Sequence, residues 1–204
     1  MKTLVSVWGH LPDCPIIVTA DGAKEPNTAY EEYLDAIEGM AKVGWPLEVR
    51  RFDRHVHQSG MMAEILPTVE TKLLLYLEHD WWLLPPVEWD MMARVILEGE
   101  ANYIKLYQGD RIHPLHEHMM FRRRILHGVG LIDTVQYSAN PHLASTDWYR
   151  SLTHLFTGKT DYIENLLHGP VANAPWGVFK CCIYNPVEAG MRRTQHLDGA
   201  RSPK

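Results

Sequence analysis

The sequence is poor in cysteine and has neither a long apolar run nor an excess of positive charge. Its three cysteines, Cys14, Cys181 and Cys182, form no CxxC pair, which disfavours a disulfide framework or a zinc ribbon and fits a reducing compartment. No apolar run approaches the roughly 20 residues that span a bilayer. Gly9 and His10 interrupt the first apolar stretch, unlike the apolar core of a signal peptide. We therefore expect a cytoplasmic protein.

Other signatures are also absent. A net charge of -5 over 204 residues gives no broad attraction to nucleic acid or to anionic membranes. The N-terminal region has no glycine-rich phosphate loop, and the chain has no HExxH pattern. There is no internal repeat, low-complexity tract or linker, and 204 residues with 46% hydrophobic side chains suffice for one core. A single domain over residues 1–204 is expected.

The first half of the chain alternates short apolar runs with amphipathic stretches. Strands are expected at residues 14–20, 47–52, 72–77 and 102–107, and helices at residues 29–43, 60–66 and 86–98. This alternation over residues 1–107 predicts an α/β domain with a mostly parallel sheet flanked by helices. Residues 108–204 lack the rhythm and are rich in His, Pro and Gly, which favours substrate-facing loops over the carboxyl ends of the strands.

Two acidic residues follow the most apolar run of the chain. Residues 72–77 should form a central parallel strand, and Glu78 and Asp80 leave it two positions apart, so their side chains can point the same way. Paired carboxylates suit Mg²⁺ or Mn²⁺, which can also bridge a diphosphate. An acidic surface loop after a core strand is the alternative, because acid-x-acid is a weak motif.

A second acidic strand end lies earlier in the chain. Asp21 and Gly22 directly follow the first expected strand. Taken alone, an Asp-Gly pair favours a turn in which the Asp side chain bonds to its own backbone. Two acidic strand ends in one sheet instead favour a shared nucleotide crevice, with Asp21 beside Asp80.

The order of these elements resembles the nucleotide-binding half of family-2-like GT-A glycosyltransferases, which have a Rossmann-like fold. The resemblance implies that Asp21, with Gly22, contacts the base or ribose of a nucleotide sugar. It also implies that Glu78, His79 and Asp80 correspond to the DxD-type element that binds metal and diphosphate, with Asp80 as the direct ligand of Mn²⁺ or Mg²⁺. The resemblance covers residues 4–107 and a histidine near the C-terminus. In this family such a histidine often completes the metal shell, and His196 is the candidate here.

The chain departs from this family at its start. A GT-A fold opens with a strand and a nucleotide-contacting loop before the first helix. The residues before Pro15 are too few for a strand, a loop and a crossover helix, since a crossover needs at least about 10–12 residues. Either residues 1–11 form the first helix and the opening strand is absent, or the sheet is rearranged; we expect the absent strand.

Three features of the second half have two interpretations each. His116 and His118 would share a face in an extended segment, as in a transition-metal site, but a histidine-rich acceptor-side loop is favoured because no third ligand is evident. Asp147 lies where an inverting GT-A enzyme would carry its base, and equally at a helix start capped by Ser145 or Thr146. Trp176 is either a platform for a sugar ring or a packed core residue.

These features predict an enzyme, a metal-dependent hexosyl- or pentosyltransferase that moves a sugar from a nucleotide-sugar donor to an acceptor. The acceptor is open between a protein, a glycan, a modified nucleobase and a small molecule. A non-catalytic nucleotide- or sugar-binding module of the same fold is one alternative. A nucleotidyltransferase is another, since it also uses carboxylates at strand ends and a metal, although it would be favoured by the phosphate loop that is missing here.

Overall fold

The first half of the chain alternates strands and helices, as its hydrophobic pattern predicts. A computed structural model describes residues 2–23, 25, 28–107, 112–184 and 193–197. Its first elements are α1 (Lys2–His10), β1 (Ile16–Ala20), α2 (Thr28–Lys42), β2 (Leu47–Arg51), α3 (His57–Ile65), the short helix η1 (Leu66–Thr68), β3 (Leu73–Tyr76), β4 (Trp81–Leu83), α4 (Trp89–Leu97) and β5 (Tyr103–Leu106). The expected strands and helices are confirmed to within a few residues. Helix α1 occupies the region before β1, and no described strand precedes it.

The second half holds more regular structure than its sequence indicates. Its elements are η2 (Pro114–Met119), β6 (Met120–Leu126), β7 (Val129–Thr134), β8 (His142–Ser145), α5 (Thr146–Ser151), α6 (Thr153–Phe156), α7 (Ile163–Ala172), α8 (Trp176–Phe179), β9 (Cys181–Tyr184) and β10 (Thr194–His196). Strands β6 and β7 form a hairpin through His127 and Gly128, whose φ angles of 50° and 83° suit the two-residue turn of a hairpin. The Ser145 hydroxyl accepts a hydrogen bond from Trp148 N at 3.3 Å, which confirms the expected helix cap.

The strands form three sheets. Strands β1 and β2 pair in parallel, β4 and β10 pair antiparallel, and six strands pair in the order β3-β8-β5-β9-β7-β6. In the six-stranded sheet β5 and β9 are the described parallel neighbours, while the pairings of β8, β7 and β6 are antiparallel. The fold is therefore mixed α/β, with β3, β5, β6 and β9 all pointing the same way.

The position of β3 differs from the expected central parallel strand. It lies at one end of the six-stranded sheet and pairs antiparallel with β8, from Leu73 opposite Ser145 to Tyr76 opposite His142. The reason is that β8, from the half of the chain expected to form loops, inserts between β3 and β5. The continuous apolar run still reflects burial on both faces, because alternate side chains of β3 enter different cores.

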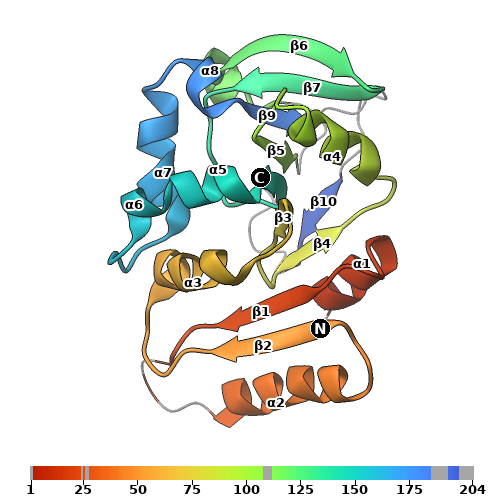
Figure 1. Cartoon of the computed structure of the whole chain (residues 1–204), viewed down its shortest axis with the longest axis vertical. Helices are drawn as coiled ribbons and strands as arrows, with labels where there is room; N and C mark the ends of the chain where they lie inside the picture. Colours follow the sequence, from red (N-terminus) through yellow and green to blue (C-terminus); the bar gives the residue numbers. More distant parts are fainter. Residues whose placement is uncertain (1, 24, 26–27, 108–111, 185–192, 198–204) are drawn as a thin grey trace.

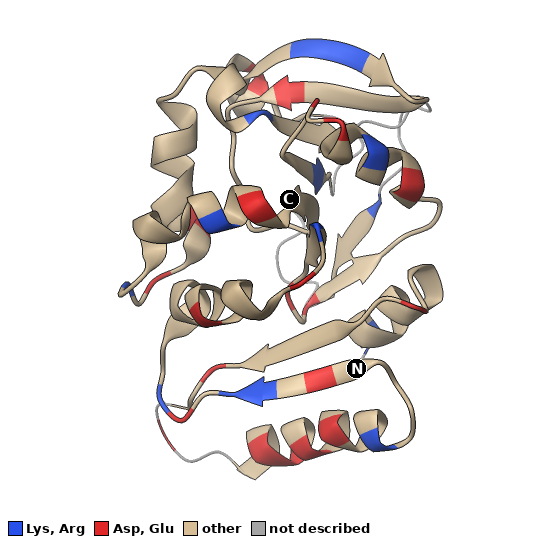
Figure 2. Cartoon of the chain, in the orientation of Figure 1, with Lys and Arg blue, Asp and Glu red and all other residues tan. Residues whose placement is uncertain are grey.

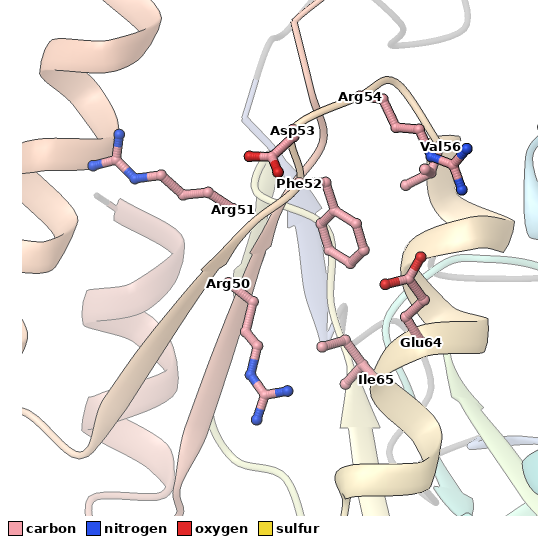
Figure 3. Close-up of a pocket in the computed structure, with 8 residues that line it drawn as sticks. All are labelled: Arg50, Arg51, Phe52, Asp53, Arg54, Val56, Glu64 and Ile65. Atoms are coloured by element: carbon pink, nitrogen blue, oxygen red, sulfur yellow. The ribbon is translucent and has the colours of Figure 1, made fainter.

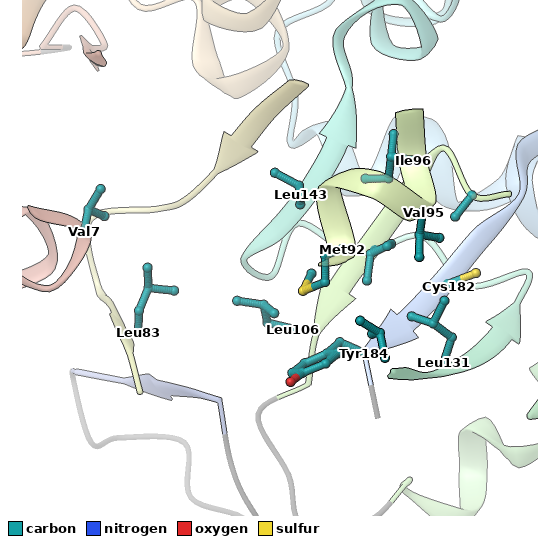
Figure 4. Packing of buried hydrophobic residues seen from close by; sticks show 13 residues of the cluster. Val7, Leu83, Met92, Val95, Ile96, Leu106, Leu131, Leu143, Cys182 and Tyr184 are labelled. Atoms are coloured by element: carbon teal, nitrogen blue, oxygen red, sulfur yellow. The ribbon is translucent and has the colours of Figure 1, made fainter. Parts of the chain in front are cut away.

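Helices cover both faces of the six-stranded sheet (Figure 1). Helix α4 packs Met92, Val95 and Ile96 against one face, where they meet Leu106 and Tyr184 (Figure 4). Helices α5, α6 and α7 cover the other face and bury Trp148, Tyr149, Phe156, Ile163 and Leu167. Among the described helices, none combines the length and apolar character that crossing a membrane requires.

Helix α2 is attached to the small parallel sheet by charge as well as by apolar packing. Figure 2 shows that acidic residues recur along α2 and that basic residues lie at the end of β2. The guanidinium of Arg51 contacts Glu31 at 2.8 Å, Asp35 at 2.6 Å and Glu38 at 2.6 Å. Because these acids are largely exposed, the apolar cluster of Ile37, Met40 and Leu47 makes the larger contribution to stability.

Candidate functional site

The candidate site lies at the edge of the six-stranded sheet where β3, β5 and β9 end. Strands β3 and β5 both run antiparallel to β8, and β9 runs parallel to β5. Their carboxyl ends, Tyr76, Leu106 and Tyr184, therefore meet at one edge of the sheet, which is where ligands bind in open α/β folds. Glu78, His79 and Asp80 follow directly from β3 at this edge.

Glu78 and His79 are tied to neighbouring elements. Gln58 Nε2, from the first turn of α3, donates to Glu78 Oε1, and Thr3 Oγ1 of α1 donates to the carbonyl oxygen of His79 at 2.5 Å. Burial, followed by the charge of Asp80, raises the pKa of Glu78. The His79 side chain itself is exposed. The segment after β3 is therefore held from both sides, with one partly buried carboxylate.

Asp80 faces His196, although 116 residues separate them in the chain. Strand β10 pairs antiparallel with β4, with His196 opposite Trp81, and Leu197 N donates to the Asp80 carbonyl at 2.6 Å. His196 Nε2 lies 3.0 Å from Asp80 Oδ2, and the ring packs edge-on to Trp81 at 4.9 Å. The residue pair that the resemblance assigns to a metal is thus brought together by a three-residue strand pairing.

Asp80 has an oxygen available for a cation. Its Oδ1 atom is buried and has no hydrogen-bond partner among the described residues, an unfavourable state for a carboxylate unless a ligand or cation occupies the position. The described residues contain no group of three or more His, Cys, Asp or Glu side chains placed to hold a metal. A carboxylate and an imidazole alone fit a cation such as Mn²⁺ or Mg²⁺ whose remaining ligands are phosphate oxygens and water.

Asp21 anchors the start of α3 instead of bonding to its own turn. Its Oδ1 accepts from Val56 N at 2.7 Å, and its Oδ2 accepts from His57 N at 3.0 Å. The Nδ1 atom of His55 lies 2.7 Å from the same Oδ2. A carboxylate at a helix N-terminus stabilises the exposed N–H groups there. Since Gln58 is the next residue of α3 and bonds to Glu78, a single helix turn connects the two acidic strand ends.

Gly22 is required by the close approach of another backbone segment. A Cβ atom on Gly22 would lie 2.2 Å from the carbonyl carbon of Arg54, so no side chain fits without moving the segment that Asp21 holds. We predict that Gly22→Ala lowers the free energy of unfolding by about 1–3 kcal/mol, measured by urea denaturation. Gly39→Ala is the matched control, because Gly39 lies in α2 with nothing within 4 Å of its Cβ position, and it should stabilise by about 0.5–1 kcal/mol. Equal effects of the two substitutions on the free energy of unfolding would refute the close approach of the Arg54 backbone to Gly22.

The structure places Asp147 and Trp176 away from this edge. Ser145 is opposite Leu73 at the beginning of β3, so Asp147, two residues later, lies at least about 10 Å from the end of that strand. Its side chain is 86% exposed and pairs with Arg150 at 3.1 Å. Trp176 Nε1 donates to the carbonyl of Cys181 at 2.8 Å, at the beginning of β9. Neither residue is positioned with Asp80 for the role expected from the sequence.

Trp176 instead packs against two arginines of β6. The guanidinium carbons of Arg122 and Arg124 lie 5.6 and 5.1 Å from its ring centre, and both arginines bond to the buried carboxylate of Asp133. The ring also borders the core on the α4 side of the sheet. Trp176 therefore matches the packed-core interpretation of the sequence.

Glu164 is a carboxylate near the site that the sequence interpretation missed. It lies in the first turn of α7, and its Oε2 accepts from Ala139 N at 3.0 Å. Its negative charge acts on the Tyr76 hydroxyl, whose pKa is raised by burial, by Glu78 and by Glu164. No spacing pattern linked Glu164 to Glu78, because the two are joined only through the packing of α7 on the sheet.

A buried aromatic network underlies the edge, centred on His142. Its ring stacks on Tyr76 with centroids 5.0 Å apart. Its Nδ1 donates to the Asn140 carbonyl at 2.6 Å, and its Nε2 lies 2.5 Å from the Tyr149 hydroxyl. With Nδ1 donating to a carbonyl, the neutral ring accepts from the hydroxyl. Burial lowers the pKa of His142 to about 3.

His142 should make the protein sensitive to mild acid. In the unfolded chain it gains a proton below its ordinary pKa of about 6.5, whereas the folded protein does not until about pH 3. The contribution of His142 to the free energy of unfolding therefore falls as the pH drops below about 6.5, and the loss is about 2 kcal/mol at pH 5. Urea denaturation at pH 7 and pH 5 should show a smaller pH dependence for His142→Gln than for the wild type. The exposed His154→Gln variant should lose as much stability between pH 7 and pH 5 as the wild type does. If His142→Gln also loses as much, His142 is not the source of the acid sensitivity.

The histidine-rich segment is helical, not extended. Residues Pro114–Met119 form η2, a 3₁₀ helix of about three residues per turn, so His116 and His118 do not share a face. His116 Nδ1 lies 3.4 Å from Gln136 Nε2, close to Lys105, which donates to Gln136 Oε1. The segment thus lies beside the end of β5, and its role as an acceptor-side loop stays a prediction.

A separate hollow of about 390 Å³ lies between the end of β2 and α3 (Figure 3). It is lined by charged and apolar side chains, among them Arg54, Val56, Glu64 and Ile65. Neither Glu78 nor Asp80 lines it. It borders the segment that Asp21 anchors, and we assign it no part in the candidate site.

Comparison with known proteins relates the fold, but not the sequence, to glycosyltransferases. No protein family and no curated protein matches the sequence. The chain is similar in structure to GalNAc-T7, solved in a crystal structure with UDP, GalNAc and Mn²⁺, with a TM-score of 0.61 and 12% identity. The match covers 89% of this chain and 39% of that one. The likeness shows that the chain has a glycosyltransferase-like fold of the GT-A type.

Proposed function

We propose that this protein is a metal-dependent glycosyltransferase that uses a nucleotide-sugar donor. The observation that carries the proposal is the contact between Asp80 and His196 at the carboxyl edge of the sheet, with Asp80 Oδ1 buried and unpaired among the described residues. The GT-A-type fold supports it, since the similar structure holds UDP and Mn²⁺. The order of strand ends further supports a family-2-like enzyme.

In this proposal Asp80 and His196 hold the cation, and Glu78 and His79 border the donor. A bound Mn²⁺ or Mg²⁺ supplies positive charge for the diphosphate leaving group. The backbone bond from Leu197 to Asp80 and the β4-β10 pairing hold the two ligands in place. Asp21 acts by fixing the start of α3, which in turn positions Gln58 on Glu78.

We propose Glu164, and not Asp147, as the carboxylate that takes the acceptor proton. An inverting transfer needs a base next to the acceptor hydroxyl. The bonds of Glu164 to Ala139 N and the Ser138 hydroxyl both use Oε2, which leaves Oε1 for a proton. Asp147 lies at the opposite edge of the sheet and is mostly exposed.

A panel of nucleotide sugars, with and without Mn²⁺, tests the proposal. A donor that binds the folded state raises the melting temperature, and the effect should require the metal. The selected donor is then incubated with the protein to measure release of the nucleoside diphosphate. Binding without turnover would favour the non-catalytic module. Release of a sugar 1-phosphate, with transfer of the nucleoside monophosphate, would favour a nucleotidyltransferase. Absence of any metal-dependent stabilisation would overturn the proposal.

A reducing compartment, such as the cytoplasm, is proposed from the cysteines. Cys14 is exposed, Cys181 and Cys182 are buried neighbours, and all three are free thiols. Cys182 donates to Asp133 Oδ1 at 3.3 Å, so its thiol form contributes to the bonding of the sheet.

A further inference from the structure

Lys105 is a buried cation with one neutral hydrogen-bond partner among the described residues. Its side chain is 2% exposed, and its Nζ donates to Gln136 Oε1 at 3.0 Å. The Tyr107 ring lies 5.7 Å away, and no described carboxylate forms an ion pair with it. Burial lowers the pKa of Lys105 to about 8 while the charge of Glu164 raises it, so the ammonium remains mostly charged at pH 7. A buried ammonium without a close counter-charge is costly, and an anionic ligand would offset that cost.

Gln136 connects this ammonium to His116. Because the amide oxygen accepts from Lys105, the amide nitrogen faces His116 Nδ1 at 3.4 Å and donates to it. The ring proton of His116 is therefore on Nε2, which is left as a donor. Burial and the charge of Lys105 lower the pKa of His116, which keeps it neutral. Other imidazoles whose charges act on it are those of His113, His118 and His168.

This polar cluster lies across His142 from the acidic segment after β3. Tyr76 and Lys105 are the register partners of His142 on its two sides, so their backbones are about 10 Å apart and their side chains share a face. Glu164 acts electrostatically on both Tyr76 and Lys105. The proposed base thus lies near both the acidic segment and the Lys105 cluster.

We propose that Lys105, Gln136 and His116 form an acceptor subsite for an anionic group, a phosphate or a carboxylate on the acceptor. The inference rests on the proposed function, because it assigns the second substrate of the same reaction. The ammonium of Lys105 supplies the charge, and His116 Nε2 supplies a hydrogen bond from the half-buried side of the subsite. An anion held here directs the rest of the acceptor toward Glu164.

The test measures anion binding without donor or divalent metal. Inorganic phosphate, a hexose phosphate and a hexuronate are titrated into the wild type, and binding is followed by melting temperature and calorimetry. We expect at least one of these anions to bind and to stabilise the protein. Lys105→Met should weaken that binding at least about tenfold, since it removes the charge-assisted bond. Preference for the hexose phosphate or for the hexuronate identifies the anionic group.

Two further variants keep the test decisive. His116→Gln retains Lys105 and the fold, and it should weaken the same anion severalfold even if Lys105→Met folds poorly. His154→Gln, an exposed imidazole on α6, should bind as the wild type does. The subsite is wrong if no anion binds, or if both Lys105→Met and His116→Gln bind with wild-type affinity. Binding of nucleoside diphosphate with Mn²⁺ at Asp80 is measured separately, so failure of the subsite leaves the proposed function standing.

Discussion

Asp80→Asn is expected to abolish metal-dependent binding of nucleoside diphosphate. The substitution keeps the size of the side chain and the backbone bond from Leu197 to the Asp80 carbonyl, so β4 and β10 should remain paired. It removes the negative charge beside His196 and replaces one of the two carboxylate oxygens with an amide NH2 group, which does not bind a cation. We expect affinity in Mn²⁺ to fall at least about 100-fold, the scale of losing a metal-ligand contact. Calorimetric titration of nucleoside diphosphate with Mn²⁺ measures it.

Two variants control this experiment. Asp147→Asn removes an exposed carboxylate at the opposite edge of the sheet and should leave the affinity unchanged. His196→Gln should reduce it by a smaller factor of about 10, because Asp80 remains. If Asp80→Asn binds nucleoside diphosphate and Mn²⁺ as tightly as the wild type, Asp80 does not hold the metal.

The first half of the fold could be predicted because its local signals agree. The strands expected at residues 14–20 and 72–77 are apolar runs that end in polar loops, and the helices expected at residues 29–43 and 86–98 have apolar residues at helical spacing. The strand neighbours could not be predicted in the same way. Strand β8 has only four residues, His142–Ser145, and its place between β3 and β5 depends on packing against α4 and α5.

The hairpin of β6 and β7 had a local signal that the sequence interpretation did not use. His127 and Gly128 form a two-residue turn with positive φ angles. Glycine in such a turn is typical of β-hairpins, because it adopts a positive φ angle without strain. The run of Arg122, Arg123 and Arg124 has the charge pattern of a solvated surface. In the structure Arg122 and Arg124 pair with the buried Asp133, a partner that no short-range pattern indicates.

The candidate site, like the fold, could be predicted only in part. Glu78 and Asp80 follow from a strand end, and the resemblance assigned His196 to the same metal as Asp80. The structure places His196 Nε2 3.0 Å from Asp80 Oδ2, and the metal itself stays a prediction. The tertiary capping of α3 by Asp21 depends on residues 35 and 36 positions away. Glu164 and Lys105 carried no motif, because the first is placed by α7 and the second is a lysine within an otherwise apolar strand.

Glu164→Gln is expected to lower the turnover rate by about 10²–10⁴, the usual contribution of a general base. Glutamine keeps an acceptor oxygen for Ala139 N and the Ser138 hydroxyl, so α7 should keep its position. Affinity for nucleoside diphosphate and Mn²⁺ should stay at the wild-type value, since Glu164 does not contact the metal pair. Release of nucleoside diphosphate under saturating donor measures the rate.

Asp147→Asn is the matched carboxylate control for this prediction. Its side chain bonds to Arg150 at the far edge of the sheet, and its turnover should equal that of the wild type. The reverse result, with Asp147→Asn inactive and Glu164→Gln active, would restore the assignment made from the sequence. A pH profile separates a base from a positioning residue, because removing a base also removes the loss of rate on the acidic side. If Glu164→Gln is slow but keeps that acidic limb, Glu164 positions the acceptor and another group takes its proton.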